Sequence, residues 1–416
     1  MKKGLFQPHY WLSWGYILLV VAVTGLVMLL AAPMPNDDYF YYQKFIEMLA
    51  GGTLDLSIPG FHGMNILSVP WYWLTESPMT QIHMQMAAGI LLPLFAFVAA
   101  RELFRSQEGG DGVWEGILFA SIIALMPFLS FSALRGWMVA IYNLLFFLTI
   151  IGAVRGRWWT CVPWAFAITS LPFAVALGPL ILAVWPKGKG GRFSCYTTIA
   201  LGLGLSALYV IIQLFQTGGI NVGVHQEQTV LSIWQGPKRM FLNFMHGVQI
   251  LFSIHNYYFV EPARTGHGNM LQTTPILTML GLFTLFSPRA HFRNRLFPLA
   301  LGLGAIIGIG LNVMLDHMDH FYMETGVFFL ILAALPLLKK HPLWLPVVLL
   351  TLHFQWFYFH LNHGEVFQLG WWFFLIPAAV DIAFLLYCIA NYKKIWSGIR
   401  SITLLSWRLI LCKNVH

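Results

Sequence analysis

The chain has very few charged residues for its length. Only 10% of its 416 residues are Asp, Glu, Lys or Arg, whereas 58% are hydrophobic and 16% are aromatic. A water-soluble protein of this size needs more charge, because so few polar side chains cannot cover its surface. The composition excludes a separate soluble domain and indicates an integral membrane protein.

Cysteines are also scarce. The four that occur fall at the expected cytoplasmic ends of helices, so we expect no disulfide: Cys161, Cys195, Cys388 and Cys412. The sequence contains no Asn-x-Ser/Thr glycosylation site and no visible internal repeat. The missing repeat argues against a secondary transporter, which is often built from inverted repeats.

Hydrophobic runs long enough to cross a bilayer recur along the whole chain. We predict an all-α polytopic protein with about 11–12 transmembrane helices, forming one domain over residues 1–392. Residues 393–416 are expected to lie on the cytoplasmic interface. The expected spans are 10–34, 79–100, 113–134, 137–154, 159–170, 172–185, 194–216, 272–287, 296–314, 323–338, 342–360 and 371–391.

Lys and Arg are distributed unevenly between the expected loops. With a cytoplasmic N-terminus, 19 of the 24 fall on the cytoplasmic side, as the positive-inside rule requires. The net charge of +8 therefore needs no nucleic-acid partner. Acidic residues gather instead in the outer loops, which topology does not require. We interpret this bias as a sign of chemistry on the outer face of a bacterial plasma membrane, the periplasmic side.

The segment from Trp158 to Trp185 is too short for two full spans. Arg155 and Arg157 precede it and Lys187 follows it, so both flanks should be cytoplasmic. The break at Ser170-Leu171-Pro172 predicts a pair of short helices that enters the membrane partway and returns. A single proline-kinked span, which would invert the later topology, is the alternative.

The first outer loop, 35–78, opens with Asn36-Asp37-Asp38 at the exit of the first span. Apolar spacing predicts a helix over 39–50, which Gly51-Gly52 would end. The two aspartates could simply cap this helix, but their position at the membrane surface favours a catalytic role. Later in the loop, His62 lies among glycines and is either a site residue or a turn residue. The aromatic run 70–73 is typical of a membrane interface.

Two further groups of polar residues are candidates. The segment 316–320 holds two Asp and two His, Asp316, His317, Asp319 and His320, which could bind a divalent metal or an anion, or form a solvated loop. Arg135 and Arg264 are arginines on the expected outer side, where they would bind either a phosphate-bearing ligand or lipid headgroups. Asp381 lies near the middle of the last span, and there we expect structural pairing rather than transport.

The sequence over residues 10–75 resembles the GT-C superfamily of membrane glycosyltransferases, which includes the protein O-mannosyltransferases and the aminoarabinose transferase of lipid A. The resemblance rests on Asp37-Asp38-Tyr39-Phe40-Tyr41 after the first span, and on the following 45–52 segment, which is similar to the loop helix of those enzymes. Phe61-His62-Gly63 and 320–323 match later family segments only loosely, because the expected prolines and arginine are missing.

The resemblance implies transfer of a sugar from a polyprenyl-phosphate donor to an acceptor hydroxyl of a glycan, lipid or protein, with inversion. It implies Asp37 as the general base and Asp38 as its partner or a metal ligand. The residues of the 316–320 segment add Asp316 and Asp319 to Asp38 as candidate ligands of a divalent cation (Mg or Mn). Donor and acceptor would be bound by Tyr41, His62, Arg135, Arg264, His320 and Tyr322. An O-antigen polymerase or ligase is the main alternative, with essential residues in the 217–271 loop; a secondary transporter is the other.

Overall fold

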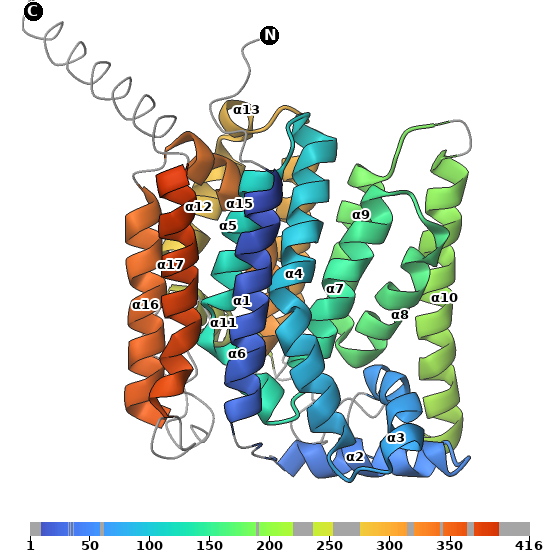
Figure 1. Cartoon of the computed structure of the whole chain (residues 1–416). Coiled ribbons are helices and arrows are strands. Elements are labelled where there is room, and N and C mark those ends of the chain that lie inside the picture. Colours follow the sequence, from blue (N-terminus) through green and yellow to red (C-terminus); the bar gives the residue numbers. More distant parts are fainter. Residues whose placement is uncertain are drawn as a thin grey trace, which may run out of the picture.

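The computed structural model describes residues 10–31, 33, 35, 37–58, 62–188, 191–218, 236–252, 275–313, 320–341, 344–363 and 370–390. Within these ranges all regular structure is helical, so the predicted fold class is confirmed. Most helices stand side by side in a bundle, and α2 (Asp37–Ala50) and α3 (Val69–Thr75) lie at one end of it (Figure 1). The helical first loop predicted from the sequence is therefore present.

Within the residues that the structure describes, three helices are long and apolar enough to cross a membrane: α1 (Tyr10–Leu30), α4 (Thr80–Glu108) and α10 (Gly191–Thr217). Other helices stand beside them: α5 (Val113–Ala124), α6 (Pro127–Leu134), α7 (Val139–Val154), α12 (Pro275–Phe286), α14 (Leu296–Val313), α15 (His320–Lys340), α16 (Trp344–His363) and α17 (Leu375–Ala390). Large apolar side chains such as Leu29, Phe215 and Ile306 are exposed on the outside of the bundle. Lipid is the solvent that suits such a surface.

One predicted span is broken. The run 113–134 forms α5 and α6 rather than a single helix, and the interruption falls at Leu125 and Met126. The cause is Pro127, which lacks an N–H group and whose ring clashes with the preceding turn of a continuous helix. The sequence contained this signal: the predicted span is made of two consecutive helices rather than one.

The short pair of helices over 158–184 enters the bundle and turns back, as predicted. Its elements are η2 (Trp158–Thr160), α8 (Cys161–Ser170), η3 (Pro172–Leu177) and α9 (Gly178–Val184), and they lie between α7 and α10 (Figure 1). The residues before and after the pair meet at one end of the bundle. Gly156 before it lies against Pro186 after it, since a Cβ atom on Gly156 would be 3.1 Å from the Pro186 ring. The alternative of a single kinked span is wrong.

The basic helix ends share the face of the bundle opposite α2. Arg155 at the end of α7 contacts Glu102 near the end of α4 at 3.5 Å, and Lys339 at the end of α15 contacts Glu115 in the first turn of α5 at 2.7 Å. The segregation of positive charge to one face, inferred from the sequence, is thus present in three dimensions.

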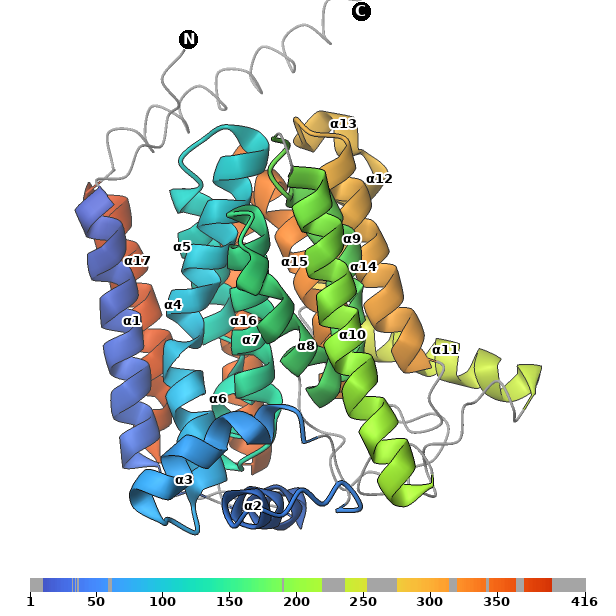
Figure 2. The same cartoon turned by 90° about the vertical axis from the view of Figure 1, so that its right-hand side faces the viewer.

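A helix that the sequence analysis did not predict, α11 (Pro237–Phe252), lies within the long 217–271 loop. It contacts α12 and α14 and extends sideways from the bundle rather than along it (Figure 2). The remaining short elements are η1 (Met64–Ser68), α13 (Pro288–His291) and η7 (Trp371–Phe374).

Asp381 in α17 forms the expected structural pair. Its Oδ2 atom lies 2.9 Å from Nε2 of His353 in α16. The pair joins two helices on the outside of the bundle, since the Asp381 side chain is 51% exposed.

Candidate active site

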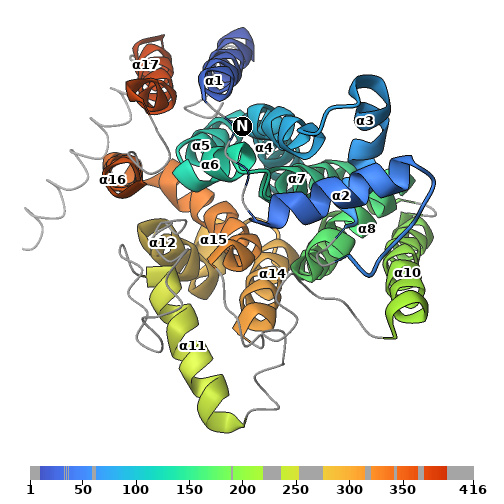
Figure 3. The same cartoon turned by 90° about the horizontal axis from the view of Figure 1, so that it is seen from below.

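Helix α2 lies across one end of the bundle because one of its faces is apolar. Tyr39, Tyr42, Phe45 and Ile46 are all at most 4% exposed, whereas Phe40 on the opposite face is 64% exposed. This spacing of buried positions is that of an amphipathic helix. Viewed from below, α2 crosses the ends of α7 and α8 (Figure 3).

The two ends of α2 are defined by residues identified in the sequence. The helix begins at Asp37, so the Asp37-Asp38 pair forms part of its first turn. It ends at Ala50, and Gly52 adopts a φ of +86°, the left-handed conformation that favours glycine. The predicted stop at Gly51-Gly52 is confirmed. The side chains of Asp37 and Asp38 lie outside the described part of the structure, so their catalytic roles stay predictions.

Two glutamine side chains attach α2 to α4, and α4 to the turn between α6 and α7. The amide oxygen of Gln43 accepts a hydrogen bond from the backbone N–H of Gln81 at 3.2 Å, and the Gln81 side chain donates to the carbonyl of Gly136 at 3.1 Å. Tyr39 donates its hydroxyl hydrogen to the carbonyl of Pro78. Burial, and to a smaller extent the negative charge of Glu47, raises the pKa of Tyr39, which keeps this donor protonated.

Arg135 lies in the turn between α6 and α7, and this turn packs against the start of α2. A Cβ atom on Gly136 would meet the Tyr39 ring at 3.1 Å, so the two backbones approach closely there. The guanidinium carbon of Arg135 lies 5.0 Å from the centre of the Trp137 ring, a cation–π contact. The fold therefore brings the Arg135 turn to the helix end that carries Asp37 and Asp38.

His62 is a packing residue in this structure. Its ring stacks on Phe45 with centroids 4.2 Å apart, and the residue is completely buried. Nε2 lies 2.8 Å from the carbonyl of Ile58, to which it donates, and Nδ1 accepts from the Asn65 amide at 3.1 Å. With both nitrogens bonded inside the loop, this geometry favours the turn alternative for His62, and its role in substrate binding stays a prediction.

The residue after His62 contacts the tip of the α8–α9 pair. A Cβ atom on Gly63 would lie 2.0 Å from the hydroxyl oxygen of Thr169, so only glycine fits there. The loop also contacts the end of α10, where the Gln216 side chain accepts from the N–H of Leu56 and donates to the carbonyl of Leu54. The first loop is therefore held against α4, α8 and α10 together.

Tyr41 is half-buried and packs against the small apolar cluster of Phe45, Leu56 and Ile58. Next to it, α3 exposes Trp71, Trp73 and Leu74, which agrees with the interfacial position expected for the 70–73 run. Of the other predicted residues, His320 and Tyr322 lie in the first turn of α15, but their side chains are outside the described part. Arg264, Asp316 and Asp319 also fall outside the described residues.

The described residues contain no group of three His, Cys, Asp or Glu side chains that could hold a metal ion. The predicted ligands Asp38, Asp316 and Asp319 are not among the described side chains. Dependence on a divalent cation therefore stays a prediction.

A buried polar pair that the sequence analysis missed lies inside the α2 end of the bundle. Glu324 is 2% exposed and Asn143 is fully buried, and the two are close enough to interact. Within the described part of the chain, Oε1 of Glu324 has no hydrogen-bond partner. Each residue lies about 6 Å from the first residue of its helix, α15 or α7. Buried carboxylates inside membranes are costly and usually functional. Glu324 and Asn143 are far apart in the sequence, so the sequence alone did not reveal the pair.

Comparisons with known proteins define the fold. No protein-family model matches the chain, and no curated protein sequence matches it. Among solved structures, the crystal structure of ArnT from Cupriavidus metallidurans bound to undecaprenyl phosphate matches with a TM-score of 0.54, covering 92% of this chain and 73% of that one. The chain has the GT-C fold. Sequence identity to ArnT is 16%, so the likeness is one of architecture. It agrees with the family resemblance of residues 10–75.

Proposed function

We propose that the protein is a glycosyltransferase that uses a polyprenyl-phosphate sugar and acts at the membrane face carrying α2. The observation that carries this proposal is the packing of Gly136 against Tyr39. It brings an arginine turn to the start of the Asp37-Asp38 helix, where a lipid-linked phosphate would reach the membrane surface. The GT-C fold supports it, and the ArnT structure of the same fold contains undecaprenyl phosphate.

The proposed reaction needs a base but no strong acid. The acceptor hydroxyl oxygen attacks the anomeric carbon, the bond from that carbon to the phosphate oxygen breaks, and polyprenyl phosphate leaves with the electron pair. Asp37 takes the proton of the acceptor hydroxyl, and Asp38 orients Asp37. Arg135 compensates the charge of the phosphate group, as guanidinium groups do. Attack opposite the leaving group inverts the anomeric configuration.

Glu324 and Asn143 would extend this site inward. A buried carboxylate with an unpartnered oxygen, next to a buried amide, is suited to hydrogen bonds with sugar hydroxyl groups. They lie near the first turns of α15 and α7, at the end of the bundle that α2 covers. We include both as donor-binding residues of the proposed enzyme.

The test is sugar transfer from a panel of polyprenyl-phosphate sugars, measured in membranes that contain wild type, Asp37→Asn or Asp38→Asn. Asp55→Asn is the matched control, because Asp55 is an aspartate of the same loop with a local role. Its carboxylate accepts hydrogen bonds from the hydroxyl and the N–H of Ser57, which lower the pKa of Asp55. We expect Asp37→Asn to lose about 100-fold or more in turnover and Asp55→Asn to stay near wild type.

Equal activity of wild type and Asp37→Asn would move the base elsewhere, first to Asp38. No turnover of any donor by well-expressed wild type would contradict the proposal. The polymerase alternative would then be tested with lipid-linked glycan, and the transporter alternative with uptake of radiolabelled solute into proteoliposomes.

A further inference from the structure

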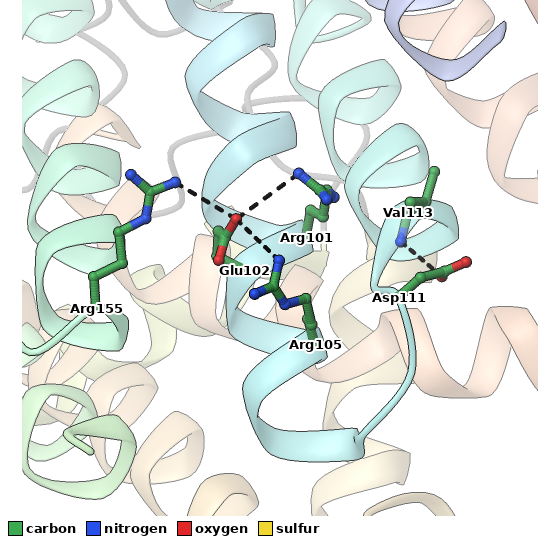
Figure 4. Close-up of polar contacts among 6 residues, drawn as sticks. All are labelled: Arg101, Glu102, Arg105, Asp111, Val113 and Arg155. Carbon is green, nitrogen blue, oxygen red and sulfur yellow. Dashed lines mark hydrogen bonds and ion pairs between the residues drawn. The ribbon is translucent and has the colours of Figure 1, made fainter. Parts of the chain in front are cut away.

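Three arginines surround one carboxylate on the basic face of the bundle, far from the proposed active site. Oε1 of Glu102 lies 3.8 Å from Arg101, 3.8 Å from Arg105 and 3.5 Å from Arg155. The first two arginines belong to α4 and the third caps α7, so the groups converge from two helices (Figure 4). This arginine cluster, Arg101, Arg105 and Arg155 around Glu102, has a net charge of +2.

Neighbouring carboxylates are engaged elsewhere. Asp111 accepts a hydrogen bond from the N–H of Val113 at 3.1 Å, at the start of α5 (Figure 4). Glu108 accepts from the N–H of Arg293 at 3.0 Å. The exposed guanidinium groups of Arg105 and Arg155 both contact the same Glu102 oxygen, although each guanidinium can bind two oxygens in parallel.

The cluster is accessible and lies at the depth of lipid headgroups. The side chains of Arg105 and Arg155 are 56% and 48% exposed, whereas that of Glu102 is 12% exposed. Trp158, three residues after Arg155, is 69% exposed. Tryptophan is enriched where the acyl region meets the headgroups. A phosphate group of a lipid at the membrane surface can therefore reach this cluster.

We propose that the arginine cluster binds the phosphate group of an anionic phospholipid in the leaflet on the basic side of the protein. A phosphodiester offers oxygens that match the guanidinium fork, and its negative charge reduces the +2 excess. Basic residues at helix ends on this side are the usual ligands of anionic lipid headgroups. The binding stabilises the junction of α4 with α7, and so the end of the bundle from which the α8–α9 pair starts.

Native mass spectrometry of the full chain, released from nanodiscs with equal amounts of phosphatidylglycerol and phosphatidylcholine, tests the proposal. We expect retained phosphatidylglycerol on wild type. Arg105→Gln with Arg155→Gln removes two contacts, each worth about 1 kcal/mol, so affinity should fall about 30-fold. Both residues are on the surface, and each single variant provides a check should the double variant express poorly. Arg289→Gln removes an exposed arginine of the same face and should change nothing.

Glu102→Gln separates lipid binding from a purely structural ion cluster. It raises the cluster charge to +3, so phosphatidylglycerol occupancy should rise by up to about 5-fold. If Glu102→Gln and the double arginine variant lower occupancy alike, or if neither changes it, the proposal is wrong. It is also wrong if inorganic phosphate displaces the lipid at millimolar concentration, because the cluster would then be a site for free phosphate.

Discussion

Replacing Gly63 with alanine tests whether the first loop depends on the tip of the α8–α9 pair. The new Cβ atom would lie 2.0 Å from the Thr169 hydroxyl oxygen, 2.7 Å from its Cβ atom and 2.9 Å from its carbonyl carbon. Ordinary contact begins at 3.4 Å, so the loop must move away by 1.4 Å. Because Gly63 has a φ of −52°, alanine adds no backbone strain and the effect is purely steric.

Overpacking of this kind costs about 1–3 kcal/mol, which increases local opening about 5- to 150-fold. Hydrogen–deuterium exchange of the α2 amides in the purified protein measures this opening directly. We expect faster exchange in α2 and lower sugar transfer, with unchanged exchange in α4 and α5. Thr169→Ala in the same chain should recover part of the protection, since it removes the nearest clashing atom.

Gly204→Ala is the control, because a Cβ atom there meets nothing within 4 Å. It should leave exchange in α2 at the wild-type rate. Unchanged α2 exchange and activity in the Gly63 variant would refute the inferred contact between the loop and the α8–α9 pair.

Substitutions at three further polar positions, Lys339, Asp381 and Glu324, test individual polar contacts of the bundle. Lys339→Met leaves the buried carboxylate of Glu115 without its 2.7 Å partner, so we expect the free energy of unfolding to fall by about 3 kcal/mol. Adding Glu115→Gln removes the buried charge and should restore most of this loss. Unchanged thermal unfolding of the Lys339 variant would contradict the expectation. Asp381→Asn keeps a hydrogen-bond acceptor for His353, so thermal stability should change little, whereas Asp381→Leu should lower it by about 1–2 kcal/mol. Glu324→Gln keeps the volume of the side chain, so we expect a melting temperature within about 2 °C of wild type. The turnover of sugar transfer should fall at least about 10-fold. Full turnover in this variant would remove Glu324 from the proposed site.

Much of the fold could be predicted because its determinants are local in sequence. Apolar length defines the spans, Gly51-Gly52 ends α2, and basic flanks identify the returning pair over 158–184. The break at Pro127 was also readable, since proline cannot continue a helix. Apolar residues spaced along 237–252, such as Phe241 and Phe244, were the missed signal of α11.

The site was harder to predict because its contacts join distant residues. His62 looked like a ligand in an exposed glycine-rich turn, and only the fold stacks it on Phe45 and bonds it to Asn65. Glu324 was merely one acidic residue near an outer loop until α15 was packed against α7. Burial and partners of this kind cannot be inferred from spacing along one chain.

The attachment of the first loop to α10 has a consequence for biosynthesis. The hydrogen bond between Gln216 and Leu54 joins residues 162 positions apart. At about 5–20 residues per second, a ribosome needs roughly 10–30 s to make the intervening chain. Until that interval has passed, the first loop lacks its partner Gln216, so the α2 region completes its folding only after α10 has been made.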